Sequence, residues 1–164
     1  MDFILEKLKQ EHIKEVTGIL NYYIENTTAA YREEAVSDDF SLRFLEGPDV
    51  YCSFVIKNNS NGIIGFCMLE PHSSLSTFSE AAEVMYFIHH KYTGNGAGSL
   101  ALEIMESEAR KRGIRKLLAD ISTENLTSID FHVKKGFDEY GRLADIGKKL
   151  GRSFGIVYLV KDLS

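Results

Sequence analysis

The chain has 164 residues, a hydrophobic fraction of 44% and a formal net charge of −5. This length fits one domain with its own core, and the acidic balance argues against nucleic-acid binding, which needs a basic face. No apolar run reaches the length of a membrane span, and charges at Asp2, Glu6 and Lys7 argue against a signal peptide. We therefore expect a soluble, cytoplasmic protein that binds neither nucleic acid nor membrane.

The first half of the chain predicts a strand, two helices and a hairpin. Residues 3–8 read as a strand, and residues 10–24 read as a helix because Ile13, Val16 and Ile19 recur at helical spacing. Ser37 is a typical N-cap residue for a second helix. Two apolar runs then predict strands joined by a polar hairpin loop, with the runs at residues 51–56 and 63–69 and the loop at 58–62.

The second half predicts strands that alternate with helices. A serine-rich loop precedes an apolar strand, a glycine-rich turn and a helix that stops near Gly113. The remaining expected elements are strands at 117–121, 137–143 and 154–160, a helix at 126–135, and a basic, flexible connection at 147–151. Together these elements predict a single α/β domain over residues 1–164, with helices covering a central mixed sheet.

The cysteines and four of the five histidines are expected to have no catalytic role. Cys52 and Cys67 both lie inside apolar runs, which favours small buried side chains in a reducing compartment. His89 and His90 are adjacent and have no cysteine or carboxylate at ligand spacing, so we predict no metal site. We expect His12 and His72 to be surface residues.

The turn from Thr93 to Gly98 carries the strongest local signal. It connects an apolar strand to a helix, so the first N–H groups of that helix lack intrahelical partners. Such groups suit a phosphate, and glycine lets a phosphate approach the main chain. By itself the pattern leaves two interpretations open, an anion-binding loop or a plain glycine-rich turn.

The run from Ala82 to Gly98 resembles the acetyl-CoA motif of the GNAT N-acetyltransferases, most closely the phosphinothricin acetyltransferase branch. Further segments resemble the same branch, at residues 21–28, 125–137, 141–143 and 147–152. The resemblance implies a GNAT fold with acetyl-CoA as co-substrate. It also implies that acetyl-CoA is held by Phe87, Ile88, His89, Thr93, Gly94, Asn95, Gly96, Ala97, Gly98, Ser99, Asn125 and Ser128.

Two catalytic residues follow from the same resemblance. Glu83 stands where this branch carries its proposed general base, and an amine must lose a proton before it attacks a thioester. His132 matches a histidine that can donate to the leaving thiolate or join a proton relay. The alternatives are a solvated carboxylate at a strand start and a structural histidine on a helix.

The substrate loops depart from the branch. The resemblance places substrate contacts at Asn26, Thr28, Tyr31, Leu75 and Phe78. Leu75 occupies the aligned position of an arginine that faces a substrate carboxylate, and Thr93 replaces a long polar residue at the start of the glycine loop. Arg43, or Arg152 from a dimer partner, are both candidates for the missing cation.

The sequence therefore predicts an acetyl-CoA-dependent N-acetyltransferase for a small, amino-acid-like amine. We expect direct attack in a ternary complex, because neither cysteine matches a catalytic position. Two other functions stay open, an acetyltransferase for peptide or protein N-termini and a non-catalytic CoA-binding sensor. We expect a homodimer, because the branch is generally dimeric and the strand at 154–160 is apolar on both faces.

Overall fold

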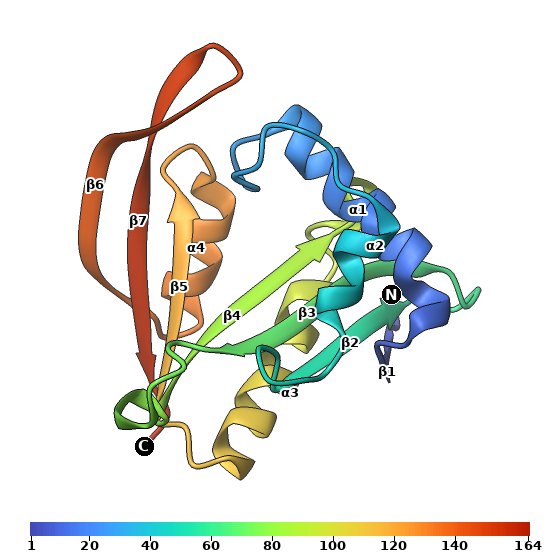
Figure 1. Ribbon diagram of the computed structural model, residues 1–164, viewed down its shortest axis with the longest axis horizontal. Helices are drawn as coiled ribbons and strands as arrows, with labels where there is room; N and C mark the ends of the chain where they lie inside the picture. Colours follow the sequence, from blue (N-terminus) through green and yellow to red (C-terminus); the bar gives the residue numbers. More distant parts are fainter.

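The computed structural model describes residues 1–164 and contains one seven-stranded sheet with helices on both faces (Figure 1). Its elements in chain order are β1 (Ile4–Lys7), η1 (Gln10–His12), α1 (Ile13–Asn26), α2 (Asp38–Ser41), η2 (Leu42–Phe44), β2 (Cys52–Lys57), β3 (Ile63–Pro71), η3 (Ser76–Phe78), β4 (Ala81–Ile88), η4 (His90–Tyr92), α3 (Ala97–Lys111), β5 (Lys116–Ser122), α4 (Leu126–Lys134), β6 (Asp138–Lys149) and β7 (Arg152–Asp162).

The sheet has the order β1-β2-β3-β4-β5-β7-β6. Every neighbouring pair is antiparallel except β4 and β5, which run parallel. The chain reaches β5 from β4 through α3, a helical crossover of the kind that parallel neighbours need. The mixed α/β sheet predicted from the sequence is confirmed.

Two apolar cores cover the two faces of the sheet. On one face α3 buries its apolar side against β2, β3, β5 and β7, using Ala97, Ala101, Leu102, Met105 and Ala109. On the other face α1 packs its buried side, with Val16, Ile19, Leu20 and Ile24, against Val55, Phe66 and Met68. Both cysteines are free and buried, as expected. We call these the α3 face and the α1 face.

One predicted element end agrees with the structure, and two others differ by two residues. Ser37 caps α2 as predicted, because its hydroxyl accepts a hydrogen bond from the Phe40 N–H at 3.2 Å. α1 continues to Asn26, two residues past the expected end. β4 begins at Ala81, so Glu83 lies inside a strand rather than at its start.

The flexible connection predicted at 147–151 is wrong. β6 and β7 stay paired through Lys149 and Arg152, and only Leu150 and Gly151 form the turn, both at positive φ. Two residues at positive φ give the type I′ turn that matches strand twist. Gly147 has a packing role instead, since a Cβ there would lie 2.7 Å from a Phe154 ring atom.

The prediction that His12 is a surface residue is also wrong. His12 is 4% exposed, because η1 folds its ring against the end of β1. Its Nδ1 accepts a hydrogen bond from the Lys9 N–H at 3.0 Å, which fixes the entry into α1. A helix-entry cap of this kind is hard to see in a lone histidine of the sequence.

Candidate active site

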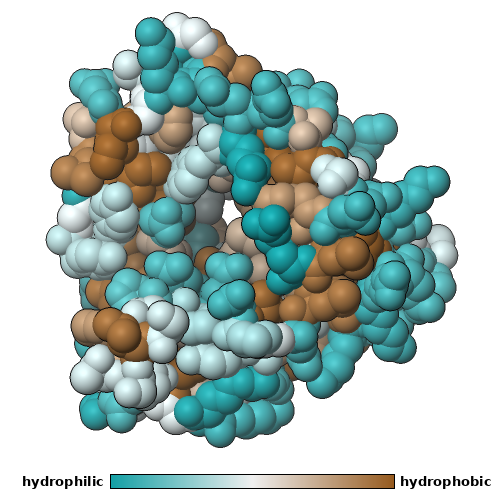
Figure 2. Space-filling view, viewed as in Figure 1, coloured by the Kyte–Doolittle hydropathy of each residue, from teal (hydrophilic) through white to brown (hydrophobic).

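β4 and β5 separate beyond a short paired stretch (Figure 1). A cleft opens between them. The two strands pair only from Ala81 to Glu83 on β4, and beyond this point β5 continues along β7 instead. The edge of β4 from Val84 to Ile88 therefore has no strand partner on that side. The resulting cleft has a volume of about 980 Å³. Figure 2 shows the molecule hollowed near its centre, over this region.

The N-terminus of α3 forms one end of the cleft. Gly94 and Gly96 adopt φ values of 78° and 92°, in the region that glycine tolerates. The first helical bond runs from the Leu100 N–H to the Gly96 carbonyl, so the six N–H groups from Gly94 to Ser99 make no backbone hydrogen bond. The Asn95 amide braces the turn by donating to the Tyr92 and Thr93 carbonyls. This arrangement fits a phosphate group.

Most of the residues expected to hold acetyl-CoA lie together around this cleft. Its lining includes Phe87, Ile88, Thr93, Gly94, Gly96, Gly98, Ser99, Asn125 and Ser128. Three others lie outside the lining: Ala97 is buried in the core, Asn95 braces the turn, and His89 stacks on His90. Asn125 also caps α4, since its side-chain oxygen accepts from the Ser128 N–H at 3.3 Å.

Glu83 lies at the opposite end of the cleft, among other acidic groups. Its Oε1 is 3.5 Å from His72 Nδ1, and Glu70 and Asp120 line the same part of the cleft. Burial and the Asp120 charge raise the pKa of Glu83, and the His72 contact opposes that shift. Burial and the Glu83 charge likewise raise the pKa of Glu70. A carboxylate with a raised pKa is well suited to accept a proton near neutral pH.

Sequence reasoning missed the partners of Glu83. His72 was expected only on the surface; it is exposed, yet it contacts Glu83 because the loop after β3 returns beside β4. Asp120 stands in β5 and reaches this group through the short parallel pairing of β4 with β5. One weak sequence signal pointed to Asp120, which is a charged residue between the apolar Ala119 and Ile121 of the predicted strand.

His132 lies on α4 with both ring nitrogens bonded. Nδ1 is 2.7 Å from the Ser128 carbonyl oxygen, and Nε2 forms a hydrogen bond with the Tyr86 hydroxyl. The ring is 3% exposed, and this burial lowers the pKa of His132. Asn125, Ser128 and His132 all line the cleft, as their spacing on one helix face predicted.

The five residues expected at the substrate are spread more widely. Tyr31 lines the cleft, where its hydroxyl donates to the Asp120 carbonyl at 3.3 Å. Thr28 is buried and bonds Ser122 and Glu124, and Asn26 is exposed at the end of α1. Leu75 and Phe78 are exposed around η3, outside the cleft lining, although the Phe78 ring lies edge-on to His72.

The two candidate cations are engaged elsewhere within the chain. Arg152 forms a bidentate pair with Glu124, at 2.8 and 2.7 Å. Arg43 stacks on the Phe40 ring and donates to the Phe40 carbonyl. Arg32 was not singled out in the sequence. Its guanidinium also stacks on the Phe40 ring, 4.2 Å from the ring centroid, and it makes no ion pair and lines the cleft.

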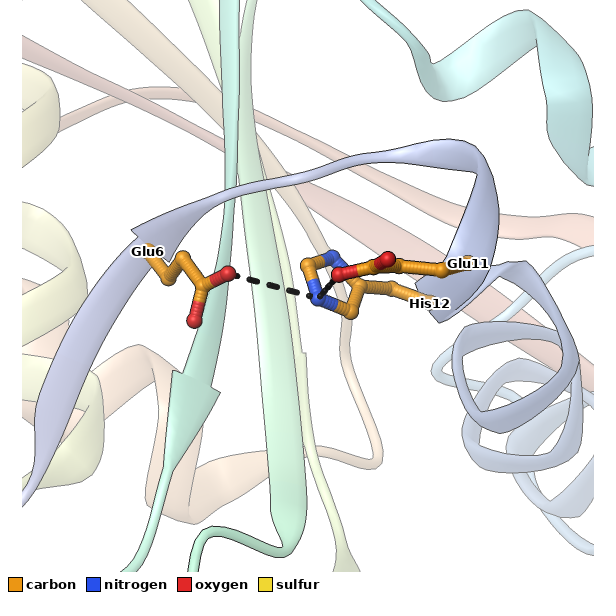
Figure 3. A group of neighbouring side chains, drawn as sticks. All are labelled: Glu6, Glu11 and His12. Carbon is orange, nitrogen blue, oxygen red and sulfur yellow. Dashed lines mark ion pairs between the residues drawn. The ribbon is translucent and has the colours of Figure 1, made fainter.

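Glu6, Glu11 and His12 form a second cluster, next to β1 (Figure 3). The His12 Nε2 is 3.6 Å from Glu6 and 3.5 Å from Glu11. Because Nδ1 already accepts the Lys9 N–H, the neutral ring must carry its proton on Nε2. That nitrogen has no lone pair for a metal, and Lys57 already binds Glu6 at 2.6 Å. The Nε2–H therefore faces two carboxylates without a hydrogen bond to either, and the cluster is not suited to a cation.

The chain is similar to known acetyltransferases. The family model described as the acetyltransferase (GNAT) family matches residues 16–137. The L-methionine sulfoximine/L-methionine sulfone acetyltransferase of Salmonella typhimurium is 26% identical over 149 residues, which cover 90% of this chain and 87% of that protein. The L-amino acid N-acyltransferase of Escherichia coli K12 is 24% identical with the same coverage.

A solved structure shows the same fold. The GNAT superfamily phosphinothricin acetyltransferase of Sinorhizobium meliloti, in complex with acetyl-CoA, superposes with a TM-score of 0.93 at 22% identity. The match covers 100% of this chain and 90% of that one. None of the helices in this protein is both long and apolar enough to cross a membrane.

Proposed function

This chain belongs to the acetyltransferase (GNAT) family, and from that membership we propose that it transfers an acetyl group from acetyl-CoA to the amine of a small, amino-acid-like substrate. The observation that carries the proposal is one cleft with a phosphate-ready helix end, an unpaired strand edge and a carboxylate of raised pKa. Each of these three features meets one need of the reaction.

The α3 N-terminus would hold the pyrophosphate of CoA. Six unpaired N–H groups and the positive end of the helix dipole supply this contact without any side chain. Because Thr93 replaces a long polar residue of the related branch, the site lacks one polar side chain but keeps all of its backbone donors. The edge of β4 from Val84 to Ile88 has no strand partner, and its main-chain groups can pair with the amide groups of the pantetheine arm, except that the Ile88 carbonyl already accepts from the Tyr23 hydroxyl.

Glu83 would act as the general base. Acetyl-CoA supplies an activated acyl group, and only the free amine attacks it, so the substrate ammonium must first lose a proton. Glu83 lies in the cleft, and its raised pKa makes it a stronger base than an ordinary glutamate. Asp120 and Glu70 keep this end of the cleft negative, which favours an incoming ammonium group.

Direct transfer in a ternary complex is part of the proposal. A covalent acyl-enzyme would need a reactive nucleophile, and Cys52 and Cys67 are 1% and 0% exposed. Burial raises the pKa of Cys52 to about 11 and holds that of Cys67 higher still, so both thiols stay protonated. The relatives named for methionine sulfone and L-amino acids support an amino-acid-like acceptor, whose carboxylate Arg32 could meet.

Release of free CoA thiol across a panel of amines tests the function. The panel should contain L-methionine sulfone, ordinary L-amino acids, simple amines without a carboxylate, and short peptides. We expect turnover of one or more amino-acid-like compounds. Turnover of peptides alone would instead support an N-terminal acetyltransferase, and binding of CoA without turnover of any amine would support a sensor.

Glu83→Gln tests the base. The amide keeps the shape of the side chain and cannot accept a proton, so we expect kcat to fall about 10²–10⁴-fold with the affinity for CoA retained. Glu103→Gln is the matched control, because Glu103 is exposed on α3, outside the cleft lining. Equal rates for the two variants between pH 6 and pH 9 would rule out Glu83 as the base.

We also propose a homodimer that works in the cytoplasm, where acetyl-CoA is available. The physical support differs from the sequence argument, since Phe154 and Ile156 of β7 are buried within this chain alone. The support comes instead from three of the exposed apolar side chains, which lie on or next to the edge strand β6, at Leu143, Ile146 and Leu150. Light scattering at micromolar concentration that gave the 18.5 kDa monomer mass would exclude the dimer.

A further inference from the structure

Tyr86 and His132 form a hydrogen-bonded pair whose proton positions can be deduced. His132 Nδ1 faces the Ser128 carbonyl oxygen at 2.7 Å, and a carbonyl only accepts. Nδ1 therefore carries the proton of the neutral ring, and Nε2 has a lone pair. The Tyr86 hydroxyl bonds that nitrogen, so Tyr86 is the donor and His132 the acceptor.

Both residues line the cleft, and Tyr86 is the more exposed of the two. Both ring nitrogens of His132 are bonded, and the ring is 3% exposed between Phe131 and Phe137. Tyr86 is half-buried in the middle of the unpaired part of β4 and lines the cleft. Its ring lies beside Gly98, since a Cβ built there would be 4.0 Å from the Tyr86 ring. A proton can reach His132 from the cleft through the Tyr86 hydroxyl.

We propose that Tyr86 is a catalytic residue that relays protons between the reacting groups and His132. His132 then acts through Tyr86, as a positioning residue and a proton store. The inference rests on the proposed acetyl transfer and adds a residue to it. It also changes the expected role of His132, which would not contact the substrates itself.

The relay balances without any further reactant. After Glu83 has taken the ammonium proton, the free amine attacks the thioester carbon, and the new C–N bond leaves a positive charge on nitrogen. One N–H proton passes to the Tyr86 oxygen as the Tyr86 proton passes to His132 Nε2. The carbonyl then reforms, and the C–S bond breaks with its electron pair going to sulfur. The His132 proton returns through Tyr86 to that sulfur, giving the amide and the CoA thiol.

The electrostatics of the two side chains suit this exchange. Burial raises the pKa of Tyr86 well above its usual value, so a phenolate is strongly disfavoured. In the relay Tyr86 never ionises, because each proton that it gives is replaced in the same step. Burial lowers the pKa of His132, so at neutral pH the ring starts with a free lone pair. An imidazolium formed there returns its proton readily.

Tyr86→Phe removes the hydroxyl and keeps the ring. We expect kcat to fall about 10²-fold, the lower end for general acid–base catalysis, with the CoA dissociation constant changed less than 3-fold by calorimetry. Tyr51→Phe is the control, since Tyr51 is a partly buried tyrosine packed on the same core, outside the cleft lining. A Tyr86→Phe variant with kcat within 3-fold of the wild type would overturn the relay.

His132→Asn tests whether the two residues act as one unit. The asparagine amide can still donate to the Ser128 carbonyl, but no ring nitrogen remains to accept from Tyr86. If they form one relay, the double variant loses no more than about 3-fold beyond the worse single variant, because residues acting together are not additive. Losses that multiply in the double variant would show independent roles and refute the pair.

A measurement on the free protein separates this inference from the proposed function. The Tyr86 hydroxyl stabilises the neutral His132 ring, so its removal should raise the His132 pKa in an NMR titration. If wild-type protein acetylates no amine, the proposed function fails and this titration decides the pair. An unchanged His132 pKa in Tyr86→Phe would show that no such hydrogen bond exists.

Discussion

Both ends of α3 carry a glycine at positive φ, which provides a matched pair of variants. Gly96 precedes the helix at φ 92°, and Gly113 follows it at φ 73°. A Cβ at either position would meet no atom within 4 Å. Alanine therefore costs only the left-handed backbone strain, about 1–2 kcal/mol at each site. For a chain of this size that loss corresponds to a fall in Tm of about 2–8 °C.

The two variants should differ in CoA affinity. The Gly96 N–H is one of the six unpaired donors, and relief of strain would turn it away from a bound phosphate. A hydrogen bond to a charged group contributes about 1.5–3 kcal/mol, so Gly96→Ala should raise the Kd for CoA about 10–100-fold. Gly113 is separated from that site by the 15 residues of α3, about 22 Å. Gly113→Ala should leave the Kd unchanged.

Calorimetry with CoA and thermal denaturation of the same samples test this reasoning. The expected pattern is two proteins of similar, reduced stability, of which one binds CoA normally. If both variants lost affinity equally, the loss would reflect general destabilisation. If Gly96→Ala bound CoA as well as the wild type, the phosphate would not be held at the N-terminus of α3.

Two further predictions concern the acidic end of the cleft and the packing of β7. Asp120→Asn removes a charge that raises the pKa of Glu83; since Glu83 must be ionised to accept a proton, the acidic limb of kcat/KM should move to lower pH by up to about one unit. A limb that stayed in place would mean that another group controls it. Gly155→Ala should reduce stability by about 1–3 kcal/mol, because its Cβ would lie 2.9 Å from Thr123 Cγ2 and 3.2 Å from Ala144 Cα. An unchanged Tm for this variant would show that β6 and β7 separate easily.

Features determined by neighbouring residues were predictable from the sequence. The apolar spacing of Val16, Ile19 and Leu20 gave α1, and Ser37 gave the start of α2, because helix faces and caps are local. The hairpin turn at Leu150 and Gly151 was missed. Its basic and glycine-rich composition indicated a flexible loop, whereas the pairing of Gly147 with Phe154 depends on two strands meeting.

The site was predictable where one segment carries the chemistry. The N–H groups before and within the first turn of α3 follow from a glycine-rich turn between a strand and a helix. The neighbours of Glu83 and His132 were not predictable, because they depend on which strands lie side by side. Tyr86 did carry one signal: its hydroxyl lies within an apolar strand, and a buried tyrosine hydroxyl usually needs a partner.

The alternation of β4 explains how the two proposed proton-transfer groups can serve one reaction. Met85 and Phe87 face the core under α1, whereas Val84 and Tyr86 face the core under α3, so Glu83 and Tyr86 point to opposite faces of the sheet. If β5 stayed paired with β4, its backbone would close the sheet and keep the Glu83 and Tyr86 side chains on separate faces. Here β5 turns away after Leu118, and both side chains border the same gap. An amine entering from the α1 face would meet Glu83 first, and the thioester between the strands would be within reach of the Tyr86 hydroxyl from the other side.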